Sequence, residues 1–218
     1  VMLIQDRNNP QSYAPARLNK QEYFMTTISR LHNFDGSTGT PSVAYYVEYA
    51  DPSITTATYP VVVTAQRANV TDAKIRAEQY NLKAAAGYRA EVMNPESTTD
   101  IVHPIDTVPA LQHYRLVHES PNNVFDSTSG ADIRYVKIFE YVKGARIKGE
   151  GIIEVPVITN TGRSFIYRQE SVNGEFIVPY STTGSTYDVK TTGKYTIKGT
   201  GKQYEVPESA IAEGKTVQ

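Results

Sequence analysis

Few residues of this 218-residue sequence have the types and spacing of a catalytic centre. Ser120 follows His118 and Glu119, an arrangement that could suggest a hydrolase. Neighbouring side chains of an extended segment point apart, however, and the sequence has no Gly-x-Ser-x-Gly turn that would expose a nucleophile. The histidines do not have a metal-binding spacing either. We therefore expect structural roles for the four of them, His32, His103, His113 and His118.

Apolar residues at helical spacing are the next candidates. Residues 18–36 predict a helix that ends at Asp35-Gly36, with apolar side chains recurring on one face at Phe24, Met25, Ile28 and Leu31. Met25 and Ile28 could form a small apolar wall in a binding pocket. Periodicity alone favours the other interpretation, that both are ordinary core residues.

Two strands are predicted after this helix. Residues 43–49 and 59–64 are rich in β-branched and aromatic side chains, and Asp51-Pro52-Ser53 between them is typical of a turn. They predict a hairpin or small barrel, inserted at about residues 38–68.

A second helix is predicted next. Thr71 or Asp72 would cap its start, and Gly87 would end it. The residues expected to share one face of it are Ile75, Leu82 and Ala86.

The residue pattern of the sequence changes near residue 130. Residues 122–130 are rich in Asn, Ser, Asp and Gly and are the best candidate for a linker. Further on, short β segments alternate with turn pairs such as Asn173-Gly174, which supply the positive φ angles that tight hairpins need. The predicted strands are residues 135–142, 152–158, 164–169, 175–180, 187–190, 194–198 and 203–206. Strands at this spacing predict an antiparallel β-sandwich or barrel.

The predicted fold class is therefore α+β, with a mixed helical and β core followed by the sandwich or barrel. We expect two domains, residues 1–133 and residues 134–218. The second also resembles transthyretin-like, carboxypeptidase-regulatory β modules, which mostly support or bind. The segments that carry this resemblance are Lys143-Gly144-Ala145-x-Ile147, Thr159-Asn160-x-Gly162 and Gly174-x-Phe176-x-Val178-Pro179.

Composition excludes several classes of function. The net charge is −1, from 22 basic and 23 acidic residues, which gives nucleic-acid binding no electrostatic support. The sequence has no cysteine, so disulfides and thiol nucleophiles are excluded. No run approaches the roughly 20 apolar residues that a membrane-spanning helix needs, and no signal peptide is visible.

Three segments in order resemble one known family. They are Met25-x-x-Ile28 followed by Arg-Leu-x-x-Phe-Asp-Gly, residues 109–120, and residues 134–149. The chain resembles the C-terminal globular domain of the catalytic subunit of archaeal oligosaccharyltransferase, AglB, which is related to eukaryotic STT3 and bacterial PglB. In this family a Met-x-x-Ile motif lines the pocket that recognises the acceptor Ser or Thr. The resemblance therefore assigns Met25 and Ile28 to that pocket.

The resemblance implies a glycosyltransferase on the extracytoplasmic face of a membrane. The full-length enzyme would transfer a glycan from a dolichol-phosphate carrier to Asn in Asn-x-Ser/Thr, with Mn or Mg as its metal. Its partners would be an acceptor polypeptide and the lipid-linked oligosaccharide, and no nucleic acid. We expect neither catalytic residues nor metal ligands in this chain, which would be inactive by itself.

One departure from the family is an absence. The family signature is Trp-Trp-Asp-Tyr-Gly, and this sequence contains no tryptophan. Either the chain is a piece of a longer protein that carries the signature upstream, or it is a divergent paralogue that lost it. The alternative function is a non-enzymatic extracellular β-rich binding or surface-layer module.

Overall fold

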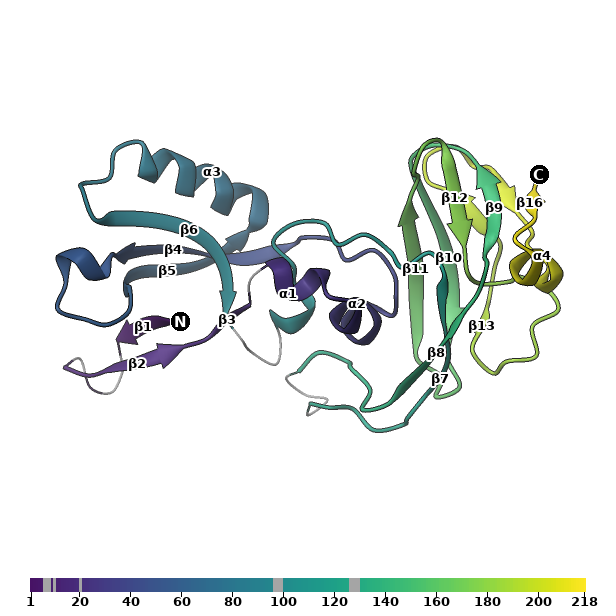
Figure 1. The fold of residues 1–218 in the computed structure, drawn as a ribbon, viewed down its shortest axis with the longest axis horizontal. Helices are drawn as coiled ribbons and strands as arrows, with labels where there is room; N and C mark the ends of the chain where they lie inside the picture. The colour runs from purple at the N-terminus through teal and green to yellow at the C-terminus, as the bar shows by residue number, and fades with distance from the viewer. Residues whose placement is uncertain (6–8, 10, 20, 96–99, 126–129) are drawn as a thin grey trace. The chain divides into compact units, whose positions relative to one another are not determined.

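The computed structural model of the chain describes residues 1–218 except residues 6–8, 10, 20, 96–99 and 126–129 (Figure 1). The fold consists of two compact units. The first contains Val1–Phe24 and Thr40–Thr107, and the second contains Met25–Gly39 and Val108–Gln218. Both units combine helices with β-sheets, so the predicted α+β fold class is confirmed. The predicted linker, residues 122–130, lies partly outside the described residues, and the division into domains at residue 134 stays a prediction.

The first unit is built on a six-stranded sheet with the order β2-β1-β5-β4-β6-β3. Its strands are β1 (Met2–Gln5), β2 (Tyr13–Ala16), β3 (Leu18–Asn19), β4 (Val43–Ala50), β5 (Val61–Asn69) and β6 (Tyr88–Pro95). Neighbouring strands are antiparallel except β1 and β5, which are parallel. The predicted hairpin is present as β4 and β5, joined through the 3-10 helix η1 (Pro52–Ile54). A second 3-10 helix, η2 (Asp100–Val102), follows β6.

The helix α3 (Val70–Asn81) covers one face of this sheet (Figure 1). It packs through the small residues Ala73 and Ala77 against Tyr46 of β4 and Ala90 of β6. The side chain of Asn69 caps the helix by accepting a hydrogen bond of 2.9 Å from the backbone N–H of Thr71.

The predicted cap of this helix, Thr71 or Asp72, and its predicted end at Gly87 were wrong. Ile75, Leu82 and Ala86 are exposed, and the helix ends at Asn81 rather than at Gly87. The bulky Tyr46 ring fills the space between helix and sheet, so the helix approaches through its alanines instead of its larger apolar side chains.

The helix predicted over residues 18–36 was also wrong in its extent. Residues 18–19 are strand, and the helical part is divided into α1 (Gln21–Met25) and α2 (Thr27–Phe34). Thr26 separates them with φ −65° and ψ 146°, an extended backbone conformation. Its hydroxyl accepts a 3.2 Å hydrogen bond from the backbone N–H of Ser29, so Thr26 is the N-cap of α2.

The second unit contains two sheets that share one hydrophobic core, together with a separate strand pair. The larger sheet has the order β11-β10-β14-β15, with β13 also paired to β10; the smaller has the order β12-β9-β16; and β7 pairs with β8. The strands are β7 (Tyr114–Glu119), β8 (Lys137–Tyr141), β9 (Ala145–Lys148), β10 (Ile152–Ile158), β11 (Ser164–Glu170), β12 (Glu175–Val178), β13 (Lys190–Thr191), β14 (Tyr195–Ile197), β15 (Gln203–Tyr204) and β16 (Thr216–Val217). Only the short β9–β16 pair is parallel within these sheets.

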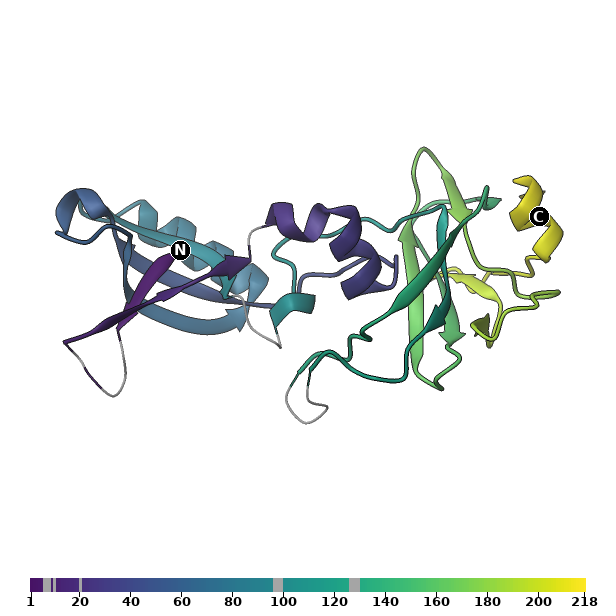
Figure 2. The same cartoon turned by 60° about the horizontal axis from the view of Figure 1, so that its bottom comes forward.

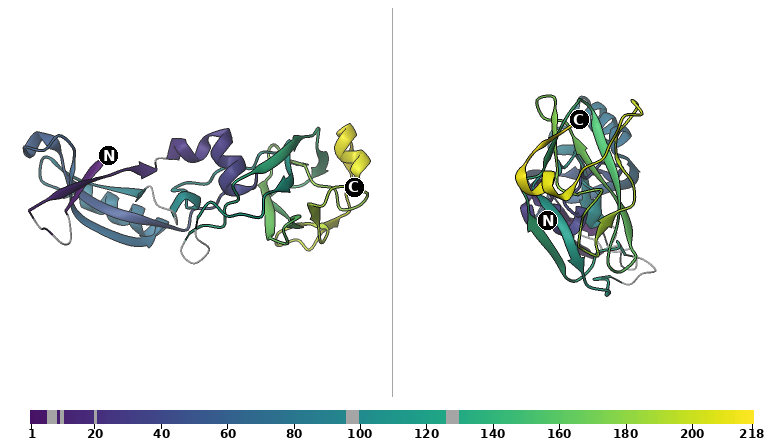
Figure 3. Two further views of the ribbon diagram at one scale, coloured as in Figure 1. Left: turned by 90° about the horizontal axis from the view of Figure 1, so that it is seen from below. Right: turned by 90° about the vertical axis from the view of Figure 1, so that its right-hand side faces the viewer.

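The core of the second unit lies between these sheets. Ile147 of β9 and Phe176 of β12 are buried in one cluster with Val155 of β10 and Tyr167 of β11. Figures 2 and 3 show β10 and β11 as a long pair, with the helix α4 (Glu208–Glu213) next to the C-terminal end of the chain. The buried side chain of Ile211 joins α4 to the same cluster.

Two features of this unit differ from the sequence-based expectation. The predicted strand at residues 187–190 is reduced to Lys190–Thr191, and α4 was not predicted. The short helix has no side-chain cap, since Pro207 occupies its N-cap, and it therefore leaves a weak sequence signal. None of the helices in the described part of the chain has the length and apolarity that crossing a bilayer requires.

Candidate functional site

Met25 and Ile28 lie on either side of the break between the two helices. Met25 is the last residue of α1, and Ile28 is the second residue of α2. Their side chains are 42% and 80% exposed, respectively, so neither is a core residue of the described chain. The two residues belong to the same compact unit.

The helix α2 has an unusual distribution of polar and apolar residues. Its buried residues are the polar Ser29 and Asn33, and the Asn33 side-chain amide donates a 3.0 Å hydrogen bond to the Ser29 hydroxyl. Ile28, in contrast, projects into solvent. An ordinary surface helix buries its apolar stripe and exposes its polar one. This helix therefore displays an apolar side chain that its own packing does not need.

Polar contacts hold α2 against the rest of the second unit. The Arg30 guanidinium donates hydrogen bonds of 2.7 and 3.0 Å to the Pro109 carbonyl and one of 2.9 Å to the Ala110 carbonyl. Burial lowers the pKa of Arg30 from its usual value. Beyond the helix, the Thr38 N–H donates to the Arg168 carbonyl of β11 over 2.9 Å. The middle of the helix and the segment that follows it are thus attached to the rest of the second unit.

The C-terminal end of α2 enters a buried ionic network. Asp35 adopts the left-handed conformation, with φ 55°, and ends the helix. Its carboxylate accepts two hydrogen bonds from Arg163, of 2.8 and 2.9 Å, and one of 2.7 Å from the Lys137 ammonium. The same ammonium donates to the His32 carbonyl over 2.8 Å. Two cations of the β scaffold therefore meet one anion at the helix end.

Glu119 completes this network from β7. Its fully buried carboxylate accepts a 2.5 Å hydrogen bond from Arg163 and bonds of 2.7 and 2.6 Å from the hydroxyls of Thr159 and Thr161. Burial alone would raise the pKa of Glu119, but the hydrogen bonds from Arg163 and the two threonines outweigh it and lower the pKa to about 2. Glu119 is thus an ionised structural anion rather than a member of a hydrolytic centre.

The contacts of two of the four histidines fit the predicted structural role. His113 Nδ1 lies 3.1 Å from the Val142 carbonyl oxygen, and His103 Nδ1 lies 3.1 Å from the Ser42 hydroxyl. Among the described residues, no group of three or more histidine, aspartate or glutamate side chains is arranged to hold a metal ion. The ionic network was not predicted, because its members are as far apart in sequence as residues 35 and 163.

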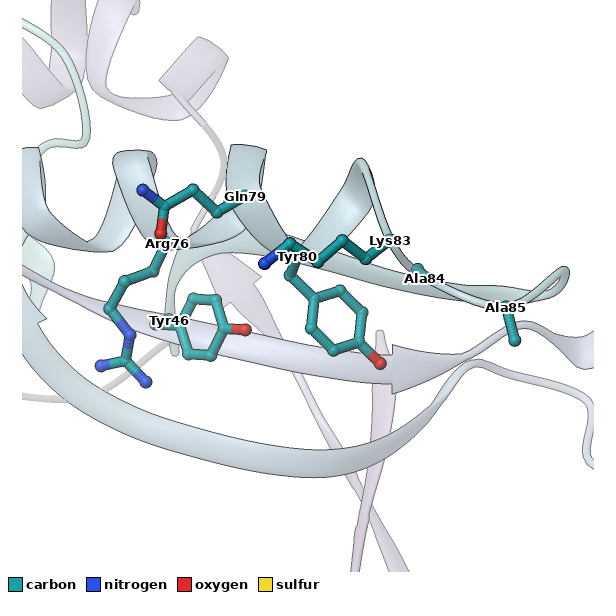
Figure 4. Close-up of a pocket in the computed structure, with 7 residues that line it drawn as sticks. All are labelled: Tyr46, Arg76, Gln79, Tyr80, Lys83, Ala84 and Ala85. Carbon is teal, nitrogen blue, oxygen red and sulfur yellow. The ribbon is translucent and has the colours of Figure 1, made fainter.

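A separate groove lies in the first unit, beside the C-terminal half of α3 (Figure 4). Its volume is about 420 Å³, and it is lined by Tyr46, Arg76, Gln79, Tyr80, Lys83, Ala84 and Ala85. The Arg76 guanidinium carbon lies 4.2 Å from the centre of the Tyr46 ring, and the same side chain donates to Gln66 over 2.8 Å. Because the main cation of the groove is already satisfied by these contacts, we assign it no chemistry.

Comparisons with known proteins find similarity to archaeal AglB. Residues 144–217 match the family model described as the archaeal glycosylation protein B long peripheral domain. This part of the chain is similar to the AglB long peripheral domain. The predicted resemblance to AglB is confirmed, and it extends over most of the chain.

Two AglB relatives match nearly the whole chain. The dolichyl-monophosphooligosaccharide–protein glycotransferase AglB of Haloferax volcanii is 27% identical over 92% of this chain. The dolichyl-phosphooligosaccharide-protein glycotransferase 3 of Archaeoglobus fulgidus is 28% identical over 94% of it. The match spans 23% of the length of each relative. The solved AglB of Archaeoglobus fulgidus with an inhibitory peptide and a dolichol-phosphate has 20% identity and a TM-score of 0.43, covering 81% of this chain and 26% of that one.

Proposed function

We propose that the chain is the globular region of an archaeal oligosaccharyltransferase catalytic subunit and that Met25 and Ile28 contribute to its acceptor Ser/Thr pocket. Both curated relatives are named as glycotransferases that act from dolichyl-linked oligosaccharides on protein. The reaction would be transfer of the glycan from its dolichol-phosphate carrier to the Asn amide nitrogen of Asn-x-Ser/Thr. Because the matched region is 23% of each relative, this activity would belong to a longer polypeptide.

The observation that carries the pocket assignment is the exposure of Ile28 on a helix whose buried residues are polar. Single exposed apolar residues are common on protein surfaces. Here, however, the exposed residue stands on a helix that is fixed by polar contacts, with Ser29 and Asn33 buried behind it. A side chain that is rigidly displayed and not required for packing is suited to contact a ligand.

The chemistry expected of this wall is recognition of a methyl group. A threonine acceptor would place its methyl against Met25 and Ile28, whereas a serine has no methyl to place there. The hydroxyl common to both acceptors would be recognised by the family signature Trp-Trp-Asp-Tyr-Gly, which this sequence lacks. The chain would thus supply part of a recognition pocket and no group that breaks or forms a bond.

We propose that the metal ion and the lipid-linked substrate of the reaction bind outside this chain. The described residues hold no metal-binding group, so the Mn or Mg of the full-length enzyme would bind elsewhere. The partners of that enzyme would be the acceptor polypeptide and the lipid-linked oligosaccharide. We place the chain on the extracytoplasmic face of the cell membrane, as part of a membrane protein.

The pocket assignment is tested by Ile28→Ala in the full-length enzyme. Loss of one apolar contact is expected to weaken use of an Asn-x-Thr peptide by roughly 1–3 kcal/mol, about 10- to 200-fold. Use of an Asn-x-Ser peptide should change less, so the Thr-to-Ser ratio of kcat/KM should fall. The measurement is that ratio, determined from initial rates of glycopeptide formation.

Leu31→Ala on the same helix is the matched control. Leu31 is partly buried, so its truncation should lower thermal stability without changing the Thr-to-Ser ratio. If Ile28→Ala weakened both acceptors equally, the proposed pocket would be wrong.

A further inference from the structure

We infer that Lys137 and Asp35 are positioning residues that set the direction in which α2 presents Ile28. This inference deepens the proposed function, because its consequence for acceptor choice rests on the pocket assignment. Its structural part concerns only the attachment of α2 to the rest of the second unit, which can be measured without any transfer reaction.

Lys137 acts as a cap on the C-terminal end of α2. Its side chain is 1% exposed, and its ammonium bonds both to the His32 carbonyl, at 2.8 Å, and to Asp35, at 2.7 Å. The last carbonyls of a helix have no partner within the helix and carry its negative dipole end. A buried ammonium at that place therefore fixes both the position and the axis of the last turn.

Asp35 links the end of α2 to Arg163 of the β scaffold. Arg163 binds Asp35 through two parallel hydrogen bonds, and it also binds Glu119 of β7. Bidentate bonds between guanidinium and carboxylate restrict orientation as well as distance. A continuous series of charge-assisted hydrogen bonds thus runs from α2 to β7, to β8 and to the turn between β10 and β11.

Such a network is better suited than hydrophobic packing to fix the direction of the helix. Replacing a buried ion pair by apolar residues is often neutral or stabilising, because burial of charges costs free energy. Hydrophobic contacts are non-directional, and the buried residues of α2 are polar. Hydrogen bonds therefore set the direction of this helix. Those at its C-terminal end involve the buried ammonium of Lys137, whose side chain is 1% exposed.

The structural part is tested by Lys137→Met in this 218-residue chain. Methionine keeps an unbranched stem but cannot bond to His32 or Asp35, and Asp35 keeps its two bonds to Arg163. Because the sequence has no cysteine, nitroxide labels can be placed at Ile28→Cys and at Gln203→Cys, an exposed position of β15. Double electron–electron resonance then gives the distribution of distances between α2 and the β scaffold. We expect a broader or shifted distribution in Lys137→Met.

Arg115→Met is the matched control. Arg115 is another buried cation of the same unit, 6% exposed, and it bonds to Glu140 and Glu208 rather than to α2. Its loss should lower thermal stability but leave the label distances unchanged. Unchanged distances in Lys137→Met, or equal changes in both variants, would overturn the positioning role.

Acceptor choice tests the consequence in the full-length enzyme. Lys137→Met should raise the KM for an Asn-x-Thr peptide and lower the Thr-to-Ser ratio, in the same direction as Ile28→Ala, while Arg115→Met should change neither. If Ile28→Ala lowers the ratio and Lys137→Met does not, the positioning role fails and the pocket stands. If Ile28→Ala has no effect on the ratio, the pocket fails, and the label distances still decide the positioning role.

Discussion

At the scale of single residues, Glu119 shows how burial and hydrogen bonding compete over one carboxylate. Its side chain is fully buried, which alone would favour the neutral acid. Arg163 and the hydroxyls of Thr159 and Thr161 supply enough hydrogen bonds to keep it ionised, with a pKa of about 2. The ionic network that includes α2 therefore also contains Glu119, a group whose protonation lowers the stability of the fold.

We predict a loss of stability between about pH 4.5 and pH 2. Since the pKa of Glu119 is lower in the folded chain than its ordinary value of 4.5, the unfolded chain takes up a proton first as the pH falls. The contribution is about 3 kcal/mol at neutral pH, of which roughly 2 kcal/mol is lost by pH 3. Urea unfolding at pH 7, 4.5 and 3 measures it.

Glu119→Gln is the variant that isolates this contribution. It should be less stable than the natural chain at pH 7, and the difference in the free energy of unfolding should shrink at pH 3 because Gln has no proton to bind. The exposed Glu150→Gln serves as a surface control. A difference between Glu119→Gln and the natural chain that stays constant from pH 7 to pH 3 would show that Glu119 is not the acid-sensitive group.

At the scale of elements, regular strands could be predicted from sequence and the broken helix could not. The limits of β10 at residues 152–158 agree with the prediction, because β-rich segments and turn residues are local signals. The apolar spacing of residues 24–31 gave no sign that Thr26 would leave the helix and cap the next one. Capping depends on one hydroxyl and competes directly with helix continuation.

The exposure of Met25 and Ile28 could not be predicted from periodicity either. A helical apolar stripe is expected to be buried, and only the resemblance to a known family suggested another role for this pair. The ionic network could not be predicted from sequence at all. Asp35, Glu119 and Arg163 are brought together only by tertiary structure, and they share no local sequence pattern.

The strand pair β7–β8 bears on the proposed domain boundary at residue 134. We predict that limited proteolysis cuts within residues 122–130 and that the two fragments then stay associated. β7 lies before that segment and β8 after it, and Leu116 of β7 is buried in the core of the second unit. Native mass spectrometry of the nicked protein measures the association. Fragments that separate without denaturant would contradict this expectation, and cleavage inside β10–β14 would contradict the boundary itself.

At the scale of the whole molecule, the proposed function gives α2 a role in acceptor recognition and the β-sheets of the second unit the role of a scaffold. Residues 144–217, which match the AglB long peripheral domain model, supply most of the buried core of the second unit. Its contribution to the proposed function would be mechanical, since it carries Arg163 and with it the attachment of α2. Under the proposed function, acceptor recognition and glycan transfer would belong to different parts of the polypeptide.

We therefore predict that the 218-residue chain does not transfer a glycan by itself. It has no tryptophan for the family signature, its described residues hold no metal-binding group, and it matches 23% of the length of each curated relative. The measurement is incubation of the folded chain with a lipid-linked oligosaccharide, an Asn-x-Thr peptide and Mn²⁺, with mass spectrometry of the peptide. A full-length relative in the same mixture is the positive control. Any glycopeptide formed by the chain alone would place catalytic groups within these residues and overturn the separation of recognition from transfer.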